Sequence, residues 1–161
     1  MGKLIRVGMA DMNICRAPDR ITTLGLGSCV GLVLFDIKTS VCGMLHVMLP
    51  DSSISKKTDN PAKFADTGVD KLIEELRKNG VPSRSLMAKM AGGARMFAFQ
   101  GDGDFLKIGE RNAEAVKTIL DKKGIPIIAS DCGGTYGRTI EFDPVTYKLH
   151  IRAIGKPEKA I

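Results

Sequence analysis

The feature that most constrains the fold is a pair of apolar runs separated by three polar residues. One run spans residues 29–37, the other spans residues 41–49, and Lys38-Thr39-Ser40 lies between them. Two β-rich runs with so short a polar connection are typical of a β-hairpin. Neither run approaches the ~20 apolar residues that a membrane-spanning helix needs. The sequence therefore predicts an antiparallel strand pair, without membrane insertion.

Periodicity and turn signals predict the remaining elements. Strands are expected at residues 4–9, 21–24, 86–91, 125–129 (short and buried), 139–142 and 147–154, the last two forming a hairpin around Asp143-Pro144. Residues 25–28 are expected to form a tight turn, and 51–60 a polar loop. One helix is expected from a cap at Asn60 to Asn79-Gly80, and another over about residues 110–122. Because strands and helices do not alternate strictly, the pattern indicates an α+β fold with the helices segregated to one layer.

Length and composition indicate a single domain over residues 1–161. The chain length corresponds to about one domain, and 43% hydrophobic and 26% charged residues are ordinary values for a soluble protein. The first residues lack the long apolar core of a secretion signal. We therefore expect a cytoplasmic protein, with a monomer as the default oligomeric state.

The charge pattern argues against nucleic-acid binding. The net charge is +6, but the basic residues are scattered along the chain, aromatic residues make up only 5%, and tryptophan is absent. Such a chain has little material for stacking bases. A dispersed positive field suits an acidic protein partner better, through electrostatic steering.

The cysteines and histidines favour neither disulfides nor a metal. The cysteines stand at positions 15, 29, 42 and 132 without a Cys-x-x-Cys pair, and the only histidines are His46 and His150. The cytosol keeps thiols reduced, and scattered ligands do not suit a zinc site. Neither a dinucleotide fingerprint nor a phosphate-binding loop is present, so no cofactor is expected. Cys15 (in an expected loop), Cys42 and Cys132 are interpreted as small filler residues, and His150 is placed on a solvated strand face.

The expected hairpin brings Cys29 and His46, a thiol and an imidazole that can act together in catalysis, to the same strand face. If the hairpin turn is centred on residues 38–39, His46 lies opposite Gly31, which has no side chain to block an approach. Cys29 is then the diagonal neighbour of His46, about 7–8 Å away. A thiol with a pKa near 8.5 needs a partner such as histidine to be useful at neutral pH. From the residues alone, a core role for His46 and a structural role for Cys29 remain open beside the catalytic one.

The turn before Cys29 completes a set of parts for acyl transfer. Gly27 and Ser28 leave backbone N–H groups, with that of Cys29, to converge on an oxygen. A thiol, an imidazole and such a turn are the parts of nucleophilic catalysis. By itself Thr23 is interpreted as a β-branched strand residue.

Several ordered motifs resemble the CheD family of chemoreceptor glutamine deamidases over about residues 6–154. They are Thr23-Leu-Gly-Leu-Gly-Ser-Cys29-Val, Leu45-His46-Val-Met-Leu-Pro50, Lys63-Phe-Ala-Asp-Thr67, Lys89-Met-Ala-Gly-Gly-Ala94, Ile108-Gly-Glu-Arg-Asn112, and Asp131-Cys-Gly-Gly134 with Arg138-Thr-Ile-Glu141. The resemblance implies a three-layer α/β/β sandwich, with helices on one side of mixed sheets. It assigns the family's nucleophile to Cys29, its histidine to His46 and its third functional residue to Thr23. Cys132 departs from the threonine or aliphatic residue expected there.

The resemblance also implies a function. Family members are hydrolases that convert glutamines of chemoreceptors to glutamates in chemotaxis, some also hydrolyse glutamyl methyl esters, and they pair with the phosphatase CheC. We expect a cysteine thioester intermediate and no cofactor, with residues 51–60 and 133–138 as receptor contacts. The alternative is a non-catalytic regulatory module that docks on CheC. A general cysteine peptidase is disfavoured because nothing indicates a carboxylate partner for His46.

Overall fold

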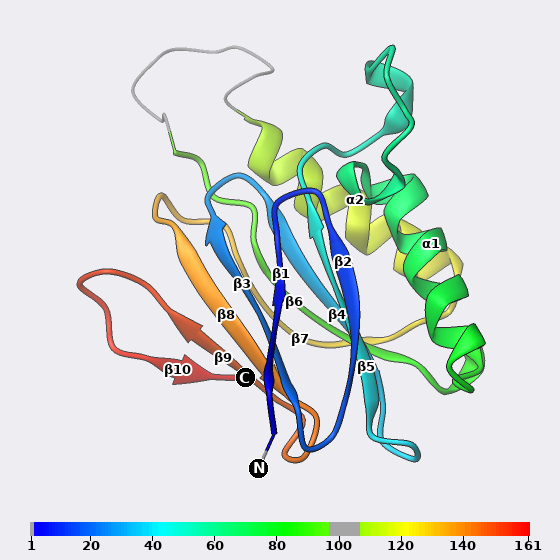
Figure 1. The fold of residues 1–161 in the computed structure, drawn as a ribbon. Coiled ribbons are helices and arrows are strands. Elements are labelled where there is room, and N and C mark those ends of the chain that lie inside the picture. Colours follow the sequence, from blue (N-terminus) through cyan, green and yellow to red (C-terminus); the bar gives the residue numbers. More distant parts are fainter. Residues whose placement is uncertain (1, 97–106) are drawn as a thin grey trace.

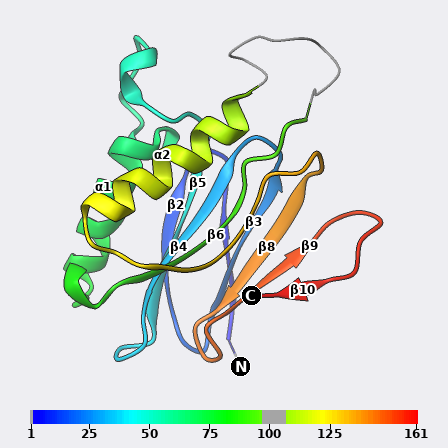
Figure 2. The same cartoon turned by 180° about the vertical axis from the view of Figure 1, so that it is seen from behind.

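Two five-stranded sheets and two helices stack as three layers (Figure 1). This computed structural model describes residues 2–96 and 107–161. The outer sheet has the order β1-β3-β8-β9-β10, and the inner sheet has the order β2-β5-β4-β6-β7. Both helices cover the face of the inner sheet that points away from the outer sheet (Figure 2). The predicted α+β class, with segregated helices and mixed sheets, is confirmed.

The elements have the following bounds. The outer sheet contains β1 (Leu4–Val7), β3 (Arg20–Leu26), β8 (Arg138–Asp143), β9 (Lys148–Arg152) and β10 (Lys159–Ala160). The inner sheet contains β2 (Met12–Arg16), β4 (Val30–Asp36), β5 (Val41–Val47), β6 (Met87–Gly92) and β7 (Ile127–Cys132). The helices are α1 (Ala65–Lys78) and α2 (Ile108–Lys122), with single 3₁₀ turns at Ser52–Ile54, Pro61–Lys63 and Ser83–Ser85. None of the helices in the described residues is long and apolar enough to cross a membrane.

The predicted hairpin is the centre of the inner sheet. β4 and β5 pair antiparallel with Gly31 opposite His46, as predicted, and every residue of both strands is buried. On the other side β4 pairs with β6. Because β4 and β5 have a layer packed on each face, their apolar runs are continuous rather than alternating.

Two separate cores hold the layers together. Between the helices and the inner sheet, Val69 and Leu72 of α1 and Val116 of α2 pack on Leu32 and Leu45. Between the two sheets the aromatic rings of Phe35 and Phe142 lie 5.0 Å apart, within a second apolar cluster. Burial of this kind stabilises a fold by about 25 cal/mol per Å² of apolar surface. The candidate site lies in the layer between the sheets.

The structure corrects several local predictions. Cys15, expected in a loop, instead lies in β2, where it is buried opposite Cys42 of β5. The sequence of β2 contains polar and charged residues because β2 is an edge strand with one open face. β7 is an edge strand rather than a buried one, with Ile128 half exposed. Asn60 caps the 3₁₀ turn at Pro61–Lys63, and α1 begins only at Ala65.

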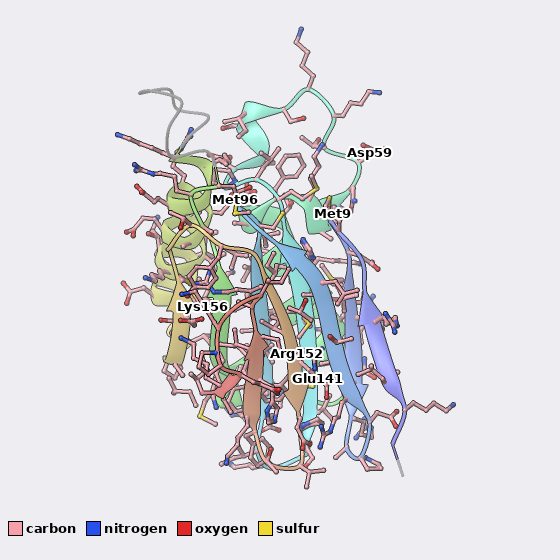
Figure 3. All side chains as sticks on the ribbon, turned by 90° about the vertical axis from the view of Figure 1, so that its left-hand side faces the viewer. Met9, Asp59, Met96, Glu141, Arg152 and Lys156 are labelled. Carbon is pink, nitrogen blue, oxygen red and sulfur yellow. The ribbon has the colours of Figure 1, made fainter. Side chains whose placement is uncertain are left out.

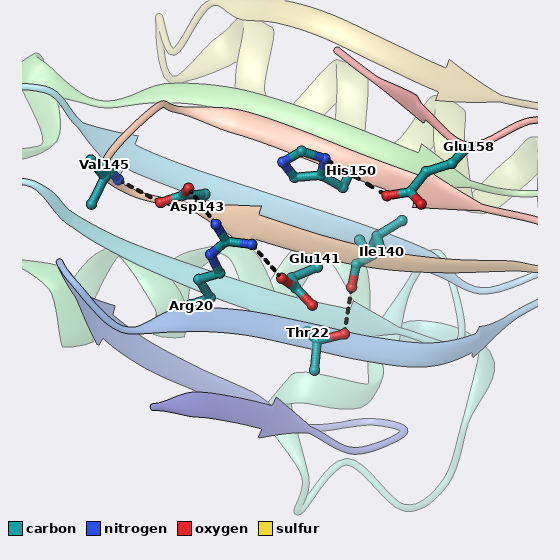
Figure 4. A network of polar contacts seen from close by, with 8 residues as sticks. All are labelled: Arg20, Thr22, Ile140, Glu141, Asp143, Val145, His150 and Glu158. Atoms are coloured by element: carbon teal, nitrogen blue, oxygen red, sulfur yellow. Dashed lines mark hydrogen bonds and ion pairs between the residues drawn. The ribbon is translucent and has the colours of Figure 1, made fainter. Parts of the chain in front are cut away.

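The outward face of the outer sheet is polar. Arg20 of β3 donates to the Glu141 carboxylate at 3.1 Å and lies 3.2 Å from the Asp143 carboxylate (Figure 4). On the same face, Nδ1 of His150 lies 3.9 Å from the Glu158 carboxylate (Figure 4). His150 therefore belongs to a partly solvated strand face, as predicted, and is separate from the layer that holds His46.

Candidate active site

Thr23, Cys29 and His46 come from three different parts of the chain and face the same layer. A side chain at Gly31 would run into Ile140 and Leu26 of the outer sheet, so this face of β4 points between the sheets. His46 pairs with Gly31 and therefore shares that face, while Cys29 precedes Gly31 by two residues and packs in the inter-sheet cluster. The room above Gly31 is thus filled by outer-sheet side chains rather than left open for the approach that the sequence suggested.

Thr23 contacts His46 across the gap between the sheets. Its hydroxyl oxygen lies 2.7 Å from Nδ1 of His46 and 2.7 Å from the backbone carbonyl of Val7. The carbonyl can only accept, so the single hydroxyl proton of Thr23 goes to Val7. Nδ1 of His46 must therefore carry a proton and donate it to Thr23. This arrangement selects the tautomer of His46 in which Nε2 is unprotonated.

His46 is held as a neutral base. Its side chain is completely buried, and burial lowers its pKa because the charged imidazolium is disfavoured away from water. Within residues 2–96 and 107–161, Nε2 has no hydrogen-bond partner. A buried nitrogen with a free lone pair costs stability, typically about 1–3 kcal/mol, and a catalytic role is one explanation for such an unpaired atom.

Cys29 is a neutral thiol in this arrangement. It is 8% exposed, and burial raises its pKa because the thiolate is disfavoured. Since Nε2 of His46 has no partner among the described residues, no hydrogen bond joins it to the thiol. Catalytic hydrogen bonds are often long in free enzymes and tighten with substrate. Cys29 and His46 therefore share one layer as neutral side chains rather than as a standing ion pair.

Backbone hydrogen bonds hold the turn that carries Cys29. The N–H of Gly93 donates to the carbonyl of Cys29 at 2.8 Å, and the N–H of Ala94 donates to the carbonyl of Gly27 at 2.9 Å. Gly92 makes this contact possible, because its φ is +111° and a Cβ atom there would run into the Cys29 carbonyl. The segment after β6 thus acts as a clamp on the turn.

The turn leaves two backbone donors rather than three. The N–H of Gly27 donates to the carbonyl of Gly25 at 3.1 Å, so it is not free as the sequence suggested. Across the described parts of the chain, the N–H groups of Ser28 and Cys29 have no acceptor. Gly27 instead contributes shape, since a Cβ atom there would lie 3.1 Å from Cγ of Met96.

Loops from both sheets surround this end of the molecule. Met9 and Met96 are both exposed at this end of the molecule (Figure 3). A groove lined by Val7, Met9, Thr23 and Leu24, among others, runs beside the site. The loop after β7 also reaches it, because the N–H of Arg95 donates to the carbonyl of Gly134 at 2.9 Å.

Two contributors were missed at the sequence level. Asn112 of α2 is completely buried and donates to backbone carbonyls of the site. Its signal was available, because it stands four residues before Val116 on the apolar stripe of the helix. In the sequence, Gly92 stands out only as part of the pair Gly92-Gly93. Among residues 2–96 and 107–161, no three His, Cys, Asp or Glu side chains are grouped so that they could hold a metal ion.

Comparison with known proteins points to the same family as the sequence motifs around Cys29 and His46. Residues 48–153 match the family model described as CheD chemotactic sensory transduction. The chain belongs to the CheD family. It is 58% identical, over the full length of both chains, to a Lachnoclostridium phytofermentans protein named probable chemoreceptor glutamine deamidase CheD. It is 52% identical, again over both full lengths, to the Halalkalibacterium halodurans chemoreceptor glutamine deamidase CheD. Identity to the Bacillus subtilis protein of that name is 51%, covering 98% of this chain and 96% of that protein.

Proposed function

We propose that this chain deamidates glutamine side chains of chemoreceptors to glutamate, with Cys29 as nucleophile, His46 as general base and acid, and Thr23 as the residue that orients His46. The observation that carries the proposal is the hydrogen bond from Nδ1 of His46 to Thr23, which leaves Nε2 unprotonated on the face shared with Cys29. The names of the full-length relatives support the same substrate and reaction.

The first half of the reaction forms a thioester. Sγ of Cys29 attacks the carboxamide carbon while Nε2 of His46 takes the thiol proton. The N–H groups of Ser28 and Cys29 stabilise the oxyanion, and one such donor is typically worth about 2.7–4 kcal/mol. The tetrahedral intermediate then breaks its C–N bond, His46 returns its proton to the nitrogen, and ammonia leaves.

The second half releases glutamate. Nε2 of His46 takes a proton from water as the water oxygen attacks the thioester carbon, and the same donors stabilise the second oxyanion. The C–S bond breaks, and the proton on His46 returns to the thiolate of Cys29. A glutamyl methyl ester would follow the same route with methanol as the leaving group, so we extend the proposal to that activity.

Three further parts belong to the proposal. A CheC-type phosphatase as partner follows from the family resemblance. A cytoplasmic location is proposed from the sequence, and a monomeric chain is the default oligomeric state. The alternative function is a non-catalytic module that docks on CheC. Under that alternative the tautomer of His46 and the free lone pair at Nε2 would have no use, so the geometry favours the enzyme.

The experiment is mass spectrometry of a receptor cytoplasmic fragment incubated with the native chain, Cys29→Ala or Cys132→Ala. Cys132 is a matched control because it is a partly buried cysteine that the mechanism does not use, and it pairs with Gly92 next to the turn that carries Cys29. We expect the native chain and Cys132→Ala to convert receptor glutamines to glutamates, and Cys29→Ala to convert none. Equal conversion by Cys29→Ala would refute the nucleophile, and no conversion of a cognate receptor by the native chain would favour the docking module.

A further inference from the structure

From the helical layer, Asn112 connects the turn that carries Cys29 to the end of the strand that carries His46. It lies in the first turns of α2, and its side-chain Nδ2 donates to the carbonyl of Ser28 at 3.0 Å and to the carbonyl of Met48 at 2.9 Å. Ser28 precedes Cys29, and Met48 follows the strand that carries His46. One amide group therefore ties the nucleophile turn to the end of β5.

The orientation of this amide is determined by its neighbours. Both neighbours are carbonyl oxygens, so the NH₂ group must face them and Oδ1 must point away. Oδ1 of Asn112 is buried and has no hydrogen-bond partner among residues 2–96 and 107–161. An unpaired buried oxygen costs about 1–3 kcal/mol of folding stability. The asparagine at this position is therefore explained by the two hydrogen bonds that its NH₂ group donates, not by a net gain in stability.

The bond to Ser28 also sets the direction of a backbone donor. The peptide unit between Ser28 and Cys29 is planar and trans, so its C=O and N–H point in opposite directions. The C=O points to Asn112 in the helical layer. The N–H of Cys29 must then point away from that layer, towards the side on which the Cys29 side chain packs between the sheets. The same argument applies to Ser28, whose N–H is directed by the bond from Ala94 to the carbonyl of Gly27.

We infer that Asn112 is a positioning residue that aims the N–H of Cys29 at the oxyanion by holding the carbonyl of Ser28. The inference rests on the proposed function, because it assigns a task within that reaction. Asn112 does not touch the substrate. It acts through the peptide unit that precedes the nucleophile.

The test compares Asn112→Leu and Asn112→Ser with the native chain in the receptor-fragment assay. Leucine has the same branching and the same number of side-chain heavy atoms as asparagine but no donors, and serine is too short to bridge two carbonyls. Val116→Ala is the matched control, since Val116 is completely buried on the same helix and packs in the helical core away from the turn. Each variant is also treated with iodoacetamide, because alkylation needs the thiol of Cys29 but forms no oxyanion.

The expected result is a fall in kcat of about 10- to 100-fold for both Asn112 variants, somewhat less than the 10²–10³-fold cost of deleting a donor outright. KM and the alkylation rate of Cys29 should stay near native values, and Val116→Ala should lower the unfolding midpoint without lowering kcat. Native kcat in either Asn112 variant would overturn the inference. So would an equal fall in kcat and alkylation, an equal fall in Val116→Ala, or failure of both variants to fold, since each indicates a merely structural role. An inactive native chain would instead refute the proposed function.

Discussion

Replacement of Thr23 by valine tests the tautomer argument most directly. Valine has nearly the shape of threonine but neither donates nor accepts a hydrogen bond. The change removes the acceptor for Nδ1 of His46 and the donor to the Val7 carbonyl, both at 2.7 Å. The imidazole is then free to carry its proton on Nε2, where it cannot accept the proton of Cys29.

The size of the effect follows from the charge that develops on His46. In the transition state Nδ1 donates from an imidazolium, and a hydrogen bond to a charged group is worth about 1.5–3 kcal/mol. At about 1.36 kcal/mol per tenfold change in rate, kcat should fall about 10- to 150-fold. Stability should fall as well, because each unpaired buried group costs about 1–3 kcal/mol.

Thr22→Val is the matched control for this prediction. Thr22 is the adjacent residue of β3, is also buried, and donates its hydroxyl proton to the carbonyl of Ile140 at 2.7 Å (Figure 4). It has no contact with His46, so Thr22→Val should lower the unfolding free energy but leave kcat unchanged. Thr23→Ser keeps the hydroxyl and should keep most of the activity.

The assay is the initial rate of glutamate formation in the receptor fragment, with nitrogen NMR of the imidazoles. Only His46 and His150 contribute signals, and native His46 should show a protonated Nδ1 and a bare Nε2. A Thr23→Val variant with kcat within twofold of native would refute the reasoning. A resting Nε2–H tautomer in the native chain would refute it independently.

Three further predictions concern the clamp, stability and the thiol. Gly92→Ala should lower both kcat and stability, because the φ of +111° suits only glycine and the added Cβ atom would displace the Cys29 carbonyl. Gly124→Ala is the control, since Gly124 also has a positive φ (+71°) but open space around it, and it should lower stability alone. Equal losses of kcat in the two variants would contradict this prediction. Burial lowers the pKa of His46 in the folded protein, whereas in the unfolded chain its pKa is about 6.5. Below about pH 6.5 the unfolded state therefore binds more protons than the folded state. Urea denaturation should therefore show the unfolding free energy falling as pH drops through and below that value, more steeply than in His46→Gln. Because burial raises the pKa of Cys29, the rate of its alkylation should be low at pH 7 and should increase only above the ordinary thiol pKa of about 8.5. Fast alkylation at neutral pH would instead indicate a standing ion pair with His46.

Much of the central hairpin could be predicted because its signals are local. A connection of a few residues sets the register, and side chains alternate between faces with a period of two. Those two facts suffice to place His46 opposite Gly31 and on the face of Cys29. The glycines that follow the helices, Gly80 and Gly124, are equally local signals, and both adopt positive φ.

The errors arose where distant segments decide the outcome. β2 has a polar edge-strand sequence, and it becomes a strand only because β5 offers it a partner. Residues 25 and 26, expected in a turn, continue β3 through an irregularity in its pairing with β8. No local period encodes either pairing.

The same division runs through the candidate site. The residue types and the hairpin register, readable along the chain, place a thiol and an imidazole on one face of one sheet. Only the packing of the outer sheet brings Thr23 to Nδ1 of His46 and thereby selects its tautomer. Only the packing of α2 brings Asn112 to the turn before Cys29. Local sequence determines which side chains share a face, whereas contacts between layers depend on how whole sheets and helices pack, and that packing alone sets the direction of each donor and acceptor.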